Sequence, residues 1–370
     1  MKKIKILFTI PNFTTAGSGR EMFNIIEGLD KSTFEPFICI KSGGGALYDE
    51  IISKGYRVII KKFNTEDISN IIKKLFAARE LARFFKQYHF DLWQSFNWSS
   101  DFTEALVAKW AGAKYLYVKK NMNWERKAWR VKSFLSHTII ARNTTLLRKH
   151  FASPYLSKKT ILIPGGVDIS QYNRGISVVR EELNIPVDAY LISCVAQIVK
   201  VKGQHILLEA IVNLPEVYVV LAGAIKDEQY IEELRKIVRD FGMESRVIIP
   251  GPISNVYKLL NASNAFVLPT SMYGGHEEGC PVALLEAMAC GIPCIASNVA
   301  GSNDLLVNDN GQLFTPDDPE ALKKCIEEYI TNKSFAENMG RNAQKTVQEK
   351  YTLDIEAYNF SKLYHKLTER

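Results

Sequence analysis

Short apolar runs alternate along the chain with longer runs in which apolar residues recur every three or four positions. The short runs, rich in Ile, Val and Phe, are typical of buried strands, and the longer ones are typical of amphipathic helices. Their alternation predicts parallel sheets covered by helices, an α/β fold. The predicted strands are 4–10, 34–41, 57–60, 91–96, 114–118 and 138–141 in the first half, and 190–198, 217–223, 246–251, 265–270 and 292–297 in the second.

Helical runs fill the gaps between these strands, notably at 203–213, 228–241, 281–290 and 318–330. The series is interrupted by the sequence PGGVD, which begins at Pro164 and ends a strand before a polar stretch. A chain of 370 residues with 46% apolar residues can form two cores of ordinary size. We therefore expect two Rossmann-like domains, at 1–168 and 169–352, and a C-terminal helix at about 353–370 that packs back on the first.

Positive charge is concentrated in the first half of the chain. Residues 1–170 carry 28 Lys and Arg against 14 Asp and Glu, whereas residues 171–370 carry 19 against 26. The net charge of +7 therefore hides a strongly basic first half. Such a field favours an anionic partner, which leaves a phosphorylated substrate, a membrane surface and nucleic acid open.

Several classes of protein are disfavoured by the sequence. The first ten residues, MKKIKILFTI, have a lysine within the apolar run and no cleavage-like site, so they are interpreted as a strand and not as an export signal. No run approaches the roughly 18 to 20 apolar residues that span a bilayer. The histidines lack metal-site spacing, and six cysteines without a CxxC pair indicate reduced, structural thiols. We expect a cytoplasmic protein that is soluble or associated with the inner face of the membrane.

The sequence EEGCPVALLEAMACGIPCIAS in the second half combines a loop, a helix and a strand. Pro281 suits the start of the helix, where its missing N–H would be orphaned in any case, and Gly291 suits the end. The amides around Val282 to Leu285 and the helix dipole would favour an anion such as a diphosphate. Glu278 and Glu286 could accept hydrogen bonds from sugar hydroxyls. An acid near a helix start is also common as a cap, but a carboxylate within ALLEAMAC is costly without partners.

The spacing of these two acids resembles a known signature. EGCPVALLE followed by AMACGIP is similar to the EX7E motif of the retaining glycosyltransferase family 4, which has the GT-B fold of two Rossmann-like domains facing each other across a cleft. The resemblance extends in the same order over nearly the whole chain. It includes a glycine turn at Gly17–Gly19, PGGVD, KVKGQ, LAG, RVIIPG, VLPTSMYGGHEEG and AGSNDLL.

This resemblance implies a nucleotide-sugar donor site in the second domain and transfer with retained configuration. Glu278 would contact the donor sugar near the reacting carbon, Glu286 would hold the ribose, and Lys202 would neutralise the leaving diphosphate. The backbone near Val247 would recognise the base. The other implied donor contacts are Gly17 and Gly19 in the first domain and Gly279, Cys280, Pro281, Val282, Leu284 and Leu285 in the second. No metal or cofactor is expected beyond a UDP-, GDP- or ADP-sugar substrate, because amides, helix dipole and Lys202 would supply the electrostatic stabilisation.

Two positions depart from that family's pattern. Gln197 stands where many members have arginine, which removes one of two cations expected at the leaving diphosphate unless Lys200 replaces it. Lys120, or Asn121 if the alignment shifts by one, stands where many members have histidine. Lys120 could contact the donor or an acceptor phosphate, or could be a solvated surface lysine. His276 adjoins the acidic loop and is a further candidate for substrate contact.

Residues 119–135 mix basic and aromatic side chains. They carry Lys119, Lys120, Arg126, Lys127, Arg130 and Lys132 with Trp124, Trp129 and Phe134. A basic helix with aromatic anchors could lie on an anionic membrane and reach a lipid-linked acceptor. The alternative is an ordinary amphipathic helix whose aromatic residues face the core.

We therefore expect an enzyme that transfers a sugar from a nucleotide diphosphate to an acceptor hydroxyl, with a lipid-linked or polysaccharide acceptor of the cell envelope. The alternatives are a nucleotide-sugar epimerase on the same fold and a non-catalytic nucleotide-sugar-binding subunit, which the Gln197 departure keeps open. Donor conversion without an acceptor would indicate the epimerase, and donor binding without transfer or hydrolysis would indicate the subunit. Nucleic-acid binding is not expected, because no recognised module accompanies the basic residues.

Overall fold

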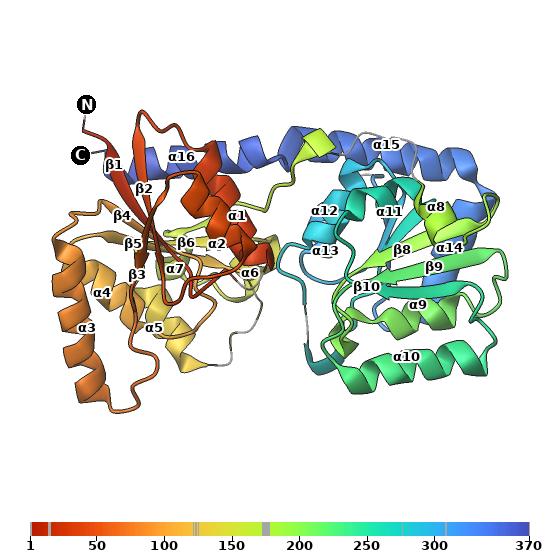
Figure 1. Ribbon diagram of the computed structural model, residues 1–370, viewed down its shortest axis with the longest axis horizontal. Helices are drawn as coiled ribbons and strands as arrows, with labels where there is room; N and C mark the ends of the chain where they lie inside the picture. Colours follow the sequence, from red (N-terminus) through yellow and green to blue (C-terminus); the bar gives the residue numbers. More distant parts are fainter. Residues whose placement is uncertain are drawn as a thin grey trace. The chain divides into compact units, whose positions relative to one another are not determined.

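The computed structural model describes residues 2–13, 16–120, 122, 124, 126–171, 178–275, 277–307 and 309–369. The chain divides into two compact units (Figure 1). The N-terminal unit comprises Met1–Gly165 and Leu353–Arg370, and the C-terminal unit comprises Gly166–Thr352. The N-terminal unit carries 31 Lys and Arg against 16 Asp and Glu, a net charge of +15, and the C-terminal unit carries 16 against 24, a net charge of −8. The positive charge therefore belongs to one unit.

The described part of the N-terminal unit contains a seven-stranded parallel sheet in the order β3-β2-β1-β4-β5-β6-β7. Helices α1, α2 and α16 cover one face of this sheet, and α3, α4 and α5 cover the other. The strands are β1 (Ile4–Thr9), β2 (Phe34–Ile40), β3 (Arg57–Ile60), β4 (Leu92–Ser95), β5 (Lys114–Lys119), β6 (Thr138–Ala141) and β7 (Thr160–Leu162). The helices are α1 (Ala16–Gly28), α2 (Ala46–Ser53), α3 (Ile71–Lys86), α4 (Thr103–Ala111), α5 (Lys127–Leu135), α6 (Thr144–Lys149), α7 (Pro154–Ser157) and α16 (Leu353–Thr368).

The C-terminal unit contains, in its described residues, a six-stranded parallel sheet in the order β10-β9-β8-β11-β12-β13. The strands are β8 (Tyr190–Val195), β9 (Val217–Ala222), β10 (Val247–Gly251), β11 (Ala265–Leu268), β12 (Cys294–Ser297) and β13 (Gln312–Phe314). The helices are α8 (Val179–Glu182), α9 (Gln204–Ala210), α10 (Glu228–Asp240), α11 (Val256–Ala262), α12 (Val282–Ala289), α13 (Ser302–Leu305), α14 (Pro319–Thr331) and α15 (Lys333–Lys350). Both units are Rossmann-like, as the alternation of the sequence predicts.

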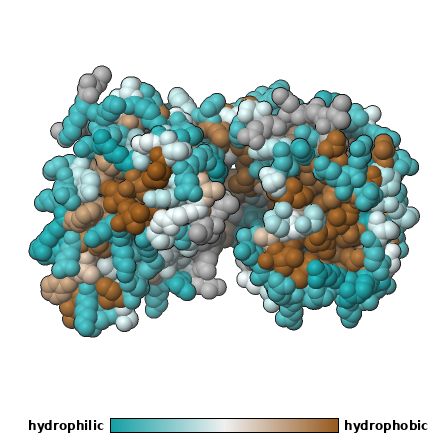
Figure 2. Space-filling view, viewed as in Figure 1, coloured by the Kyte–Doolittle hydropathy of each residue, from teal (hydrophilic) through white to brown (hydrophobic). Residues whose placement is uncertain are grey.

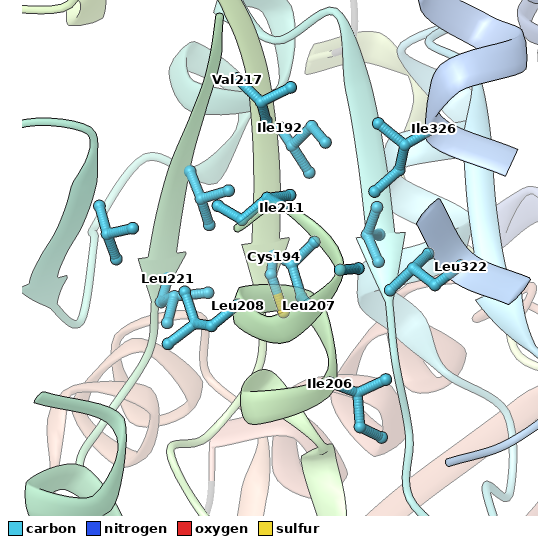
Figure 3. Close-up of a cluster of buried hydrophobic side chains, with 14 of the residues drawn as sticks. Ile192, Cys194, Ile206, Leu207, Leu208, Ile211, Val217, Leu221, Leu322 and Ile326 are labelled. Atoms are coloured by element: carbon cyan, nitrogen blue, oxygen red, sulfur yellow. The ribbon is translucent and has the colours of Figure 1, made fainter. Parts of the chain in front are cut away.

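The core of the C-terminal unit lies on the face of its sheet that α9, α10 and α14 cover. Figure 3 shows how this core is built: Ile192 and Cys194 of β8 meet Leu207 of α9, and Leu322 and Ile326 of α14 lie alongside. All of these side chains are buried, so the sheet and its helices form one packed layer structure. The opposite face is covered by α12 and α15, whose side chains pack with β11 and β12.

Each predicted strand overlaps an observed one, and differences at the ends are a few residues. The sequence did not indicate β7 and β13, each of three residues. Runs this short carry too few positions for an apolar pattern to stand out from a loop. The predicted domain boundary, after residue 168, lies three residues beyond the last residue of the first N-terminal segment, Gly165.

The C-terminal helix α16 belongs to the N-terminal unit, where it packs against α1. Gly28 of α1 permits this close approach, because a Cβ at that position would lie 2.4 Å from the Cβ of Ala357. Phe360 and Tyr364 of α16 are fully buried, and the Tyr364 ring meets Phe8 of β1 edge to face at 6.3 Å. The last helix therefore completes the core of the first unit.

The strand orders locate the place where ligands bind in folds of this kind. In each sheet the order reverses between two neighbouring strands, β1 and β4 in the N-terminal unit and β8 and β11 in the C-terminal unit. The loops at the carboxyl ends of such strands diverge and leave a crevice. In the C-terminal unit these are the loops that follow β8 and β11, which contain Lys202 and Glu278.

Candidate functional site

The loops after β8 and β11 bring Lys202 and Glu278 into direct contact. Lys202 Nζ donates to Glu278 Oε1 at 2.6 Å, and the Thr270 hydroxyl donates to the same oxygen at 2.8 Å. Glu278 is 7% exposed, so its carboxylate lies in a poorly solvated place where both donors strengthen their hold on it. Thr270 was not among the predicted site residues. Its signal in the sequence is its place as the last residue of the predicted strand 265–270.

Two glycines hold these loops together. Gly203 follows Lys202 with φ of +67°, and a Cβ there would lie 2.0 Å from the carbonyl oxygen of Pro269, the residue before Thr270. Gly301 has φ of +81°, and a Cβ there would lie 2.9 Å from the carbonyl oxygen of Glu278. Any side chain at either position would both strain the backbone and push the loops apart. The backbone conformation of these two glycines therefore keeps the loops close enough for Lys202 to contact Glu278.

Helix α12 begins at Val282, with Pro281 as its N-cap. The amides of Leu284 and Leu285 both donate to the Pro281 carbonyl oxygen, at 3.1 and 3.2 Å. This corrects the prediction that the amides through Leu285 are open to an anion: in the first turn, the amides of Val282 and Ala283 are the ones that can serve. The Leu284 and Leu285 side chains are fully buried and anchor the helix in the core.

Glu286 lies one turn into α12 and is half-buried. Residues four apart share a helix face, so Glu286 projects on the same side as Val282, which is 47% exposed. Its carboxylate is therefore less enclosed than the apolar sequence around it indicates. Gly279 and Cys280, in the loop before Pro281, are also half-buried.

Gln197 lies in the loop after β8 with an exposed side chain, while its carbonyl oxygen accepts from Gln204 Nε2 at 2.9 Å. Lys200, the proposed replacement for the missing arginine, contacts Glu233 of α10 at 3.2 Å. Both side chains of this pair are about two fifths exposed, at 39% and 43%, so the interaction is weak and can be exchanged. Gly223, which follows β9, packs against the backbone of the loop after β8, because a Cβ there would lie 1.9 Å from the Ala196 carbonyl oxygen.

The structure does not bring Val247 to this edge of the sheet. Val247 is the first residue of β10, and its amide donates to the Met243 carbonyl oxygen at 3.0 Å. Four residues of strand, roughly 13 Å, separate it from the carboxyl end of β10. The residue at that end is Gly251, whose carbonyl oxygen accepts from Gly223 at 2.9 Å. Pro252 and Ile253 follow it and are the nearer candidates for contact with a base.

Gly17 and Gly19 lie inside α1 and not in a turn, which corrects the interpretation of this segment. Gly19 packs closely, since a Cβ there would lie 2.9 Å from the Phe13 ring and 3.1 Å from the Leu47 side chain, both of which would have to shift. A Cβ at Gly17 would meet nothing within 4 Å. Asn121 and His276 lie outside the described residues.

Lys120 is part of a network of charges at the carboxyl edge of the N-terminal sheet. Its Nζ lies 2.7 Å from Glu21 of α1, and Glu21 also pairs with Arg142, which follows β6. Arg142 in turn lies 2.9 Å from Glu356 of α16. Burial lowers the pKa of Lys120 to about 7, and the Glu356 charge opposes that shift. The Lys120 side chain is mostly enclosed, so it is not a solvated surface lysine.

Half of the basic side chains in residues 119–135 are buried in the N-terminal unit or form an ion pair within it, namely Lys119, Lys120 and Lys132. Lys119 and Lys132 are fully buried, and both ammonium groups lie over the ring of Trp129, which is buried as well. Lys132 also donates to the Ser99 carbonyl oxygen at 2.9 Å. Phe134 is exposed and stacks on Tyr155. Among the helices in the described part of the chain, none is long and apolar enough to cross a membrane.

A cavity of about 230 Å³ lies in the N-terminal unit between α3 and the loop that follows β3. Asn64 lines it, is almost fully buried, and has no hydrogen-bond partner for either amide atom among the described residues. Lys61 and Lys62 lie at the same cavity, with Phe84 of α3. Nothing in the periodicity of the sequence distinguishes Asn64 from the polar residues of an ordinary loop.

Residues 176–346 match the family of glycosyl transferases group 1. Over 237 residues the chain is 26% identical to the capsular polysaccharide biosynthesis glycosyltransferase CapM of Staphylococcus aureus, a stretch that is 61% of this chain and 60% of CapM. Over 200 residues it is 26% identical to the UDP-Gal:alpha-D-GlcNAc-diphosphoundecaprenol alpha-1,3-galactosyltransferase of Escherichia coli, covering 51% of this chain and 49% of that enzyme. The matched stretches thus span about half to three fifths of these relatives.

The whole chain is similar in fold to a solved structure of a glycosyltransferase from Rickettsia africae. The TM-score is 0.86 with 18% identity, and the alignment covers 100% of both chains. A likeness at this level of identity concerns the fold. It confirms the predicted α/β architecture of two Rossmann-like domains of the GT-B class.

Proposed function

We propose that this chain is a retaining glycosyltransferase, similar to family 4 with its EX7E motif, that moves a sugar from a nucleotide diphosphate to an acceptor hydroxyl. The observation that carries this proposal is the contact of Lys202 and Thr270 with Glu278 beside the start of α12. This cluster lies at the carboxyl edge of the sheet, next to the reversal of strand order. The match of residues 176–346 to glycosyl transferases group 1 supports it.

The donor would lie across the start of α12. Its diphosphate would accept hydrogen bonds from the amides of Val282 and Ala283, where the helix dipole favours an anion. Glu286, on the same face one turn further, would accept hydrogen bonds from the ribose hydroxyls. The base would lie against the backbone from Gly251 to Ile253, because these residues occupy the carboxyl edge that Val247 does not reach.

In the proposed reaction the bond between the anomeric carbon and the diphosphate breaks, and the leaving diphosphate gains negative charge. The acceptor oxygen forms the new bond to the anomeric carbon, and the proton of the acceptor hydroxyl passes to the departing diphosphate. Lys202 and the first amides of α12 would stabilise this charge, an effect that typically contributes about 3 to 4 kcal/mol for one preorganised donor. A bound diphosphate would compete with Glu278 for Lys202 and so leave Glu278 facing the sugar. The proposed chemistry needs no metal and no further cofactor.

A binding screen of UDP-, GDP- and ADP-sugars, followed by transfer assays with the best donor, tests this proposal. Glu286→Gln should weaken donor binding roughly tenfold or more, because a charged acceptor of hydrogen bonds is lost. Glu278→Gln should lower turnover more than binding. Glu244→Gln is the matched control, since Glu244 is exposed and precedes β10 at the opposite end of the strand. If both site variants behave as this control does, the assignment of the site is wrong.

We further propose a lipid-linked or polysaccharide acceptor of the cell envelope. The name of CapM refers to capsular polysaccharide, and the name of the Escherichia coli relative refers to a diphosphoundecaprenol acceptor. The net charge of +15 on the N-terminal unit suits an acceptor that carries a diphosphate. We do not include contact of residues 119–135 with the inner face of the membrane in this proposal, because half of the cations in this segment are engaged inside the unit.

Two alternatives are separated by the same assays. A nucleotide-sugar epimerase would convert the donor in the absence of any acceptor. A non-catalytic subunit would bind the donor without transfer or hydrolysis, and the exposed Gln197 in place of a cation is the feature that favours it. Transfer that depends on an added acceptor would exclude both.

A further inference from the structure

Helix α3 of the N-terminal unit exposes large apolar side chains on its first two turns. It begins at Ile71 because the Asn70 side chain accepts from the amides of Ile72 and Lys73. Ile72 is 63% exposed and Phe76 is 69% exposed, and Ile71 and Leu75 beside them are also exposed. Figure 2 shows hydrophobic residues gathered over this lower end of α3. Side chains of this size cluster at the surface mainly where something covers them.

The exposed stripe continues along the helix as positive charge. Residues 72, 76, 79, 83 and 86 follow one another at spacings of three and four, so they share one face. The last three are Arg79, Arg83 and Lys86, all exposed. Across Ile71–Lys86 there are five Lys and Arg and one acidic residue, Glu80. One face of α3 therefore has an apolar tip followed by a row of cations.

The opposite side of α3 is fixed to the unit. Ala78, Ala82 and Phe85 are buried against the unit, and the Phe85 ring meets Trp93 of β4 edge to face at 4.8 Å. Lys74 pairs with Asp101 at 2.9 Å, just before α4, and both side chains are mostly enclosed. Since the helix has a buried side already, its exposed apolar tip is not an unused core surface.

We propose that α3 docks this protein on an anionic lipid bilayer. The apolar tip of Ile72 and Phe76 would enter the boundary between headgroups and acyl chains, and Arg79, Arg83 and Lys86 would contact lipid phosphates. The surface of a bilayer presents anionic headgroups and apolar acyl chains at different depths, which matches an apolar end of the helix followed by a row of cations. A surface that binds a protein partner does not require this separation. The purpose of docking, access to a lipid-linked acceptor, rests on the proposed function, but the docking itself does not.

Flotation with lipid vesicles tests this inference on the full-length protein. The protein should bind vesicles of phosphatidylcholine mixed with phosphatidylglycerol, release them as salt is raised, and bind much less to phosphatidylcholine alone. The variant Ile72→Ser/Phe76→Ser should bind at least about tenfold more weakly, and Arg79→Gln/Arg83→Gln should show a similar loss. All four side chains are exposed, so the variants should keep the unfolding temperature of the parent.

Phe134→Ser is the matched control, because Phe134 of α5 is 61% exposed and lies in the segment 119–135, for which the sequence leaves membrane contact open. Binding should be unchanged in this variant. Loss of binding in Phe134→Ser with retention in the α3 variants would overturn the inference, as would wild-type protein that ignores anionic vesicles at low salt. If Phe76→Ser instead converts a dimer to a monomer without affecting vesicles, α3 is an interface between copies. Transfer to a water-soluble acceptor, measured on the same variants, reports the proposed function separately.

Discussion

In each unit an ion pair lies beyond the carboxyl ends of the sheet strands. The two pairs differ in how far their side chains are buried. In the C-terminal unit, Lys202 and Glu278 form one contact whose cation is still partly exposed. In the N-terminal unit, Arg142 and Glu356 are almost fully buried and belong to a larger network with Glu21 and Lys120. The first arrangement can exchange a partner with a ligand, whereas the second cannot do so without unpacking.

The buried network links parts of the chain that are far apart in sequence. It connects α1, the ends of β5 and β6, and α16, so it fixes the C-terminal helix to the sheet. Arg142 also donates to the carbonyl oxygens of Ile163 and Pro164, at 2.8 and 3.0 Å. Equal numbers of opposite charges lie in this network, which limits the cost of burying them. Position at the carboxyl edge of a sheet is therefore not enough to identify a reactive pair.

The largest expected effect is on stability, from Arg142→Met. This change leaves the Glu21 and Glu356 carboxylates close together without the cation between them, so the free energy of unfolding should fall by about 3–5 kcal/mol. Urea denaturation measures the change. The double variant Arg142→Met/Glu356→Leu should recover much of the loss, because both buried charges are then replaced by apolar groups. A loss below about 1 kcal/mol would mean that the network is not structural and that the contrast between the units is wrong.

The next effect is on catalysis, from Lys202→Ala. Removal of the cation from the leaving diphosphate should lower kcat by about 10²–10³, with a smaller change in stability than Arg142→Met because Thr270 still donates to Glu278. Steady-state kinetics with the donor found in the screen measures it, and Lys202→Arg should retain part of the rate. A variant with unchanged kcat would show that this pair is as structural as the one in the N-terminal unit.

A third effect concerns pH. Burial, together with the nearby Lys132 charge, lowers the pKa of Lys119 from 10.5 to about 7. The unfolded chain keeps this proton up to about pH 10.5, so it binds more protons than the folded protein between the two values and stability should rise with pH across that window. Thermal unfolding between about pH 7 and pH 10 should show the rise, and Lys119→Met should make it smaller. Part of the rise should persist in the variant, because burial also lowers the pKa of Lys120 to about 7. Identical slopes in both proteins would show that Lys119 stays charged in the fold.

The sequence predicts the architecture and the centre of the site for a physical reason. Buried parallel strands are short apolar runs, and a helix start with glycines and acids has a fixed local spacing, so both leave marks within a few residues. The pairing of Lys202 with Glu278 spans 76 positions and is visible only in the structure. Three further features are also visible only in the structure. The Leu284 and Leu285 amides are already hydrogen-bonded, Val247 lies at the amino end of its strand, and half of the cations of residues 119–135 are engaged inside the N-terminal unit. Local pattern does not encode which side of an element a neighbour will cover.

A smaller effect on stability is expected at Asn64. Its amide is buried in the wall of the cavity beside α3 without a described hydrogen-bond partner, which costs about 1–3 kcal/mol relative to an apolar side chain. Asn64→Leu keeps the branching of the side chain, and the adjoining cavity has room for its larger methyl groups, so it should raise the free energy of unfolding by about 1 kcal/mol in the absence of ligands. Thr65→Val, at a neighbouring buried residue whose hydroxyl donates to the backbone carbonyl oxygen of Lys74, is the contrasting control and should lower the free energy of unfolding. If Asn64→Leu destabilises the protein, bound water satisfies this amide.

The smallest effect is expected from Lys200→Met, and it decides how the missing arginine at Gln197 is compensated. The exposed pair of Lys200 with Glu233 contributes only about 0.2–1 kcal/mol, so the unfolding temperature should barely change. Because Lys200 is directed to α10 by this pair, kcat should fall far less than in Lys202→Ala. A loss comparable to that of Lys202→Ala would show that Lys200 leaves Glu233 for the diphosphate, and the site would then hold two cations in place of one.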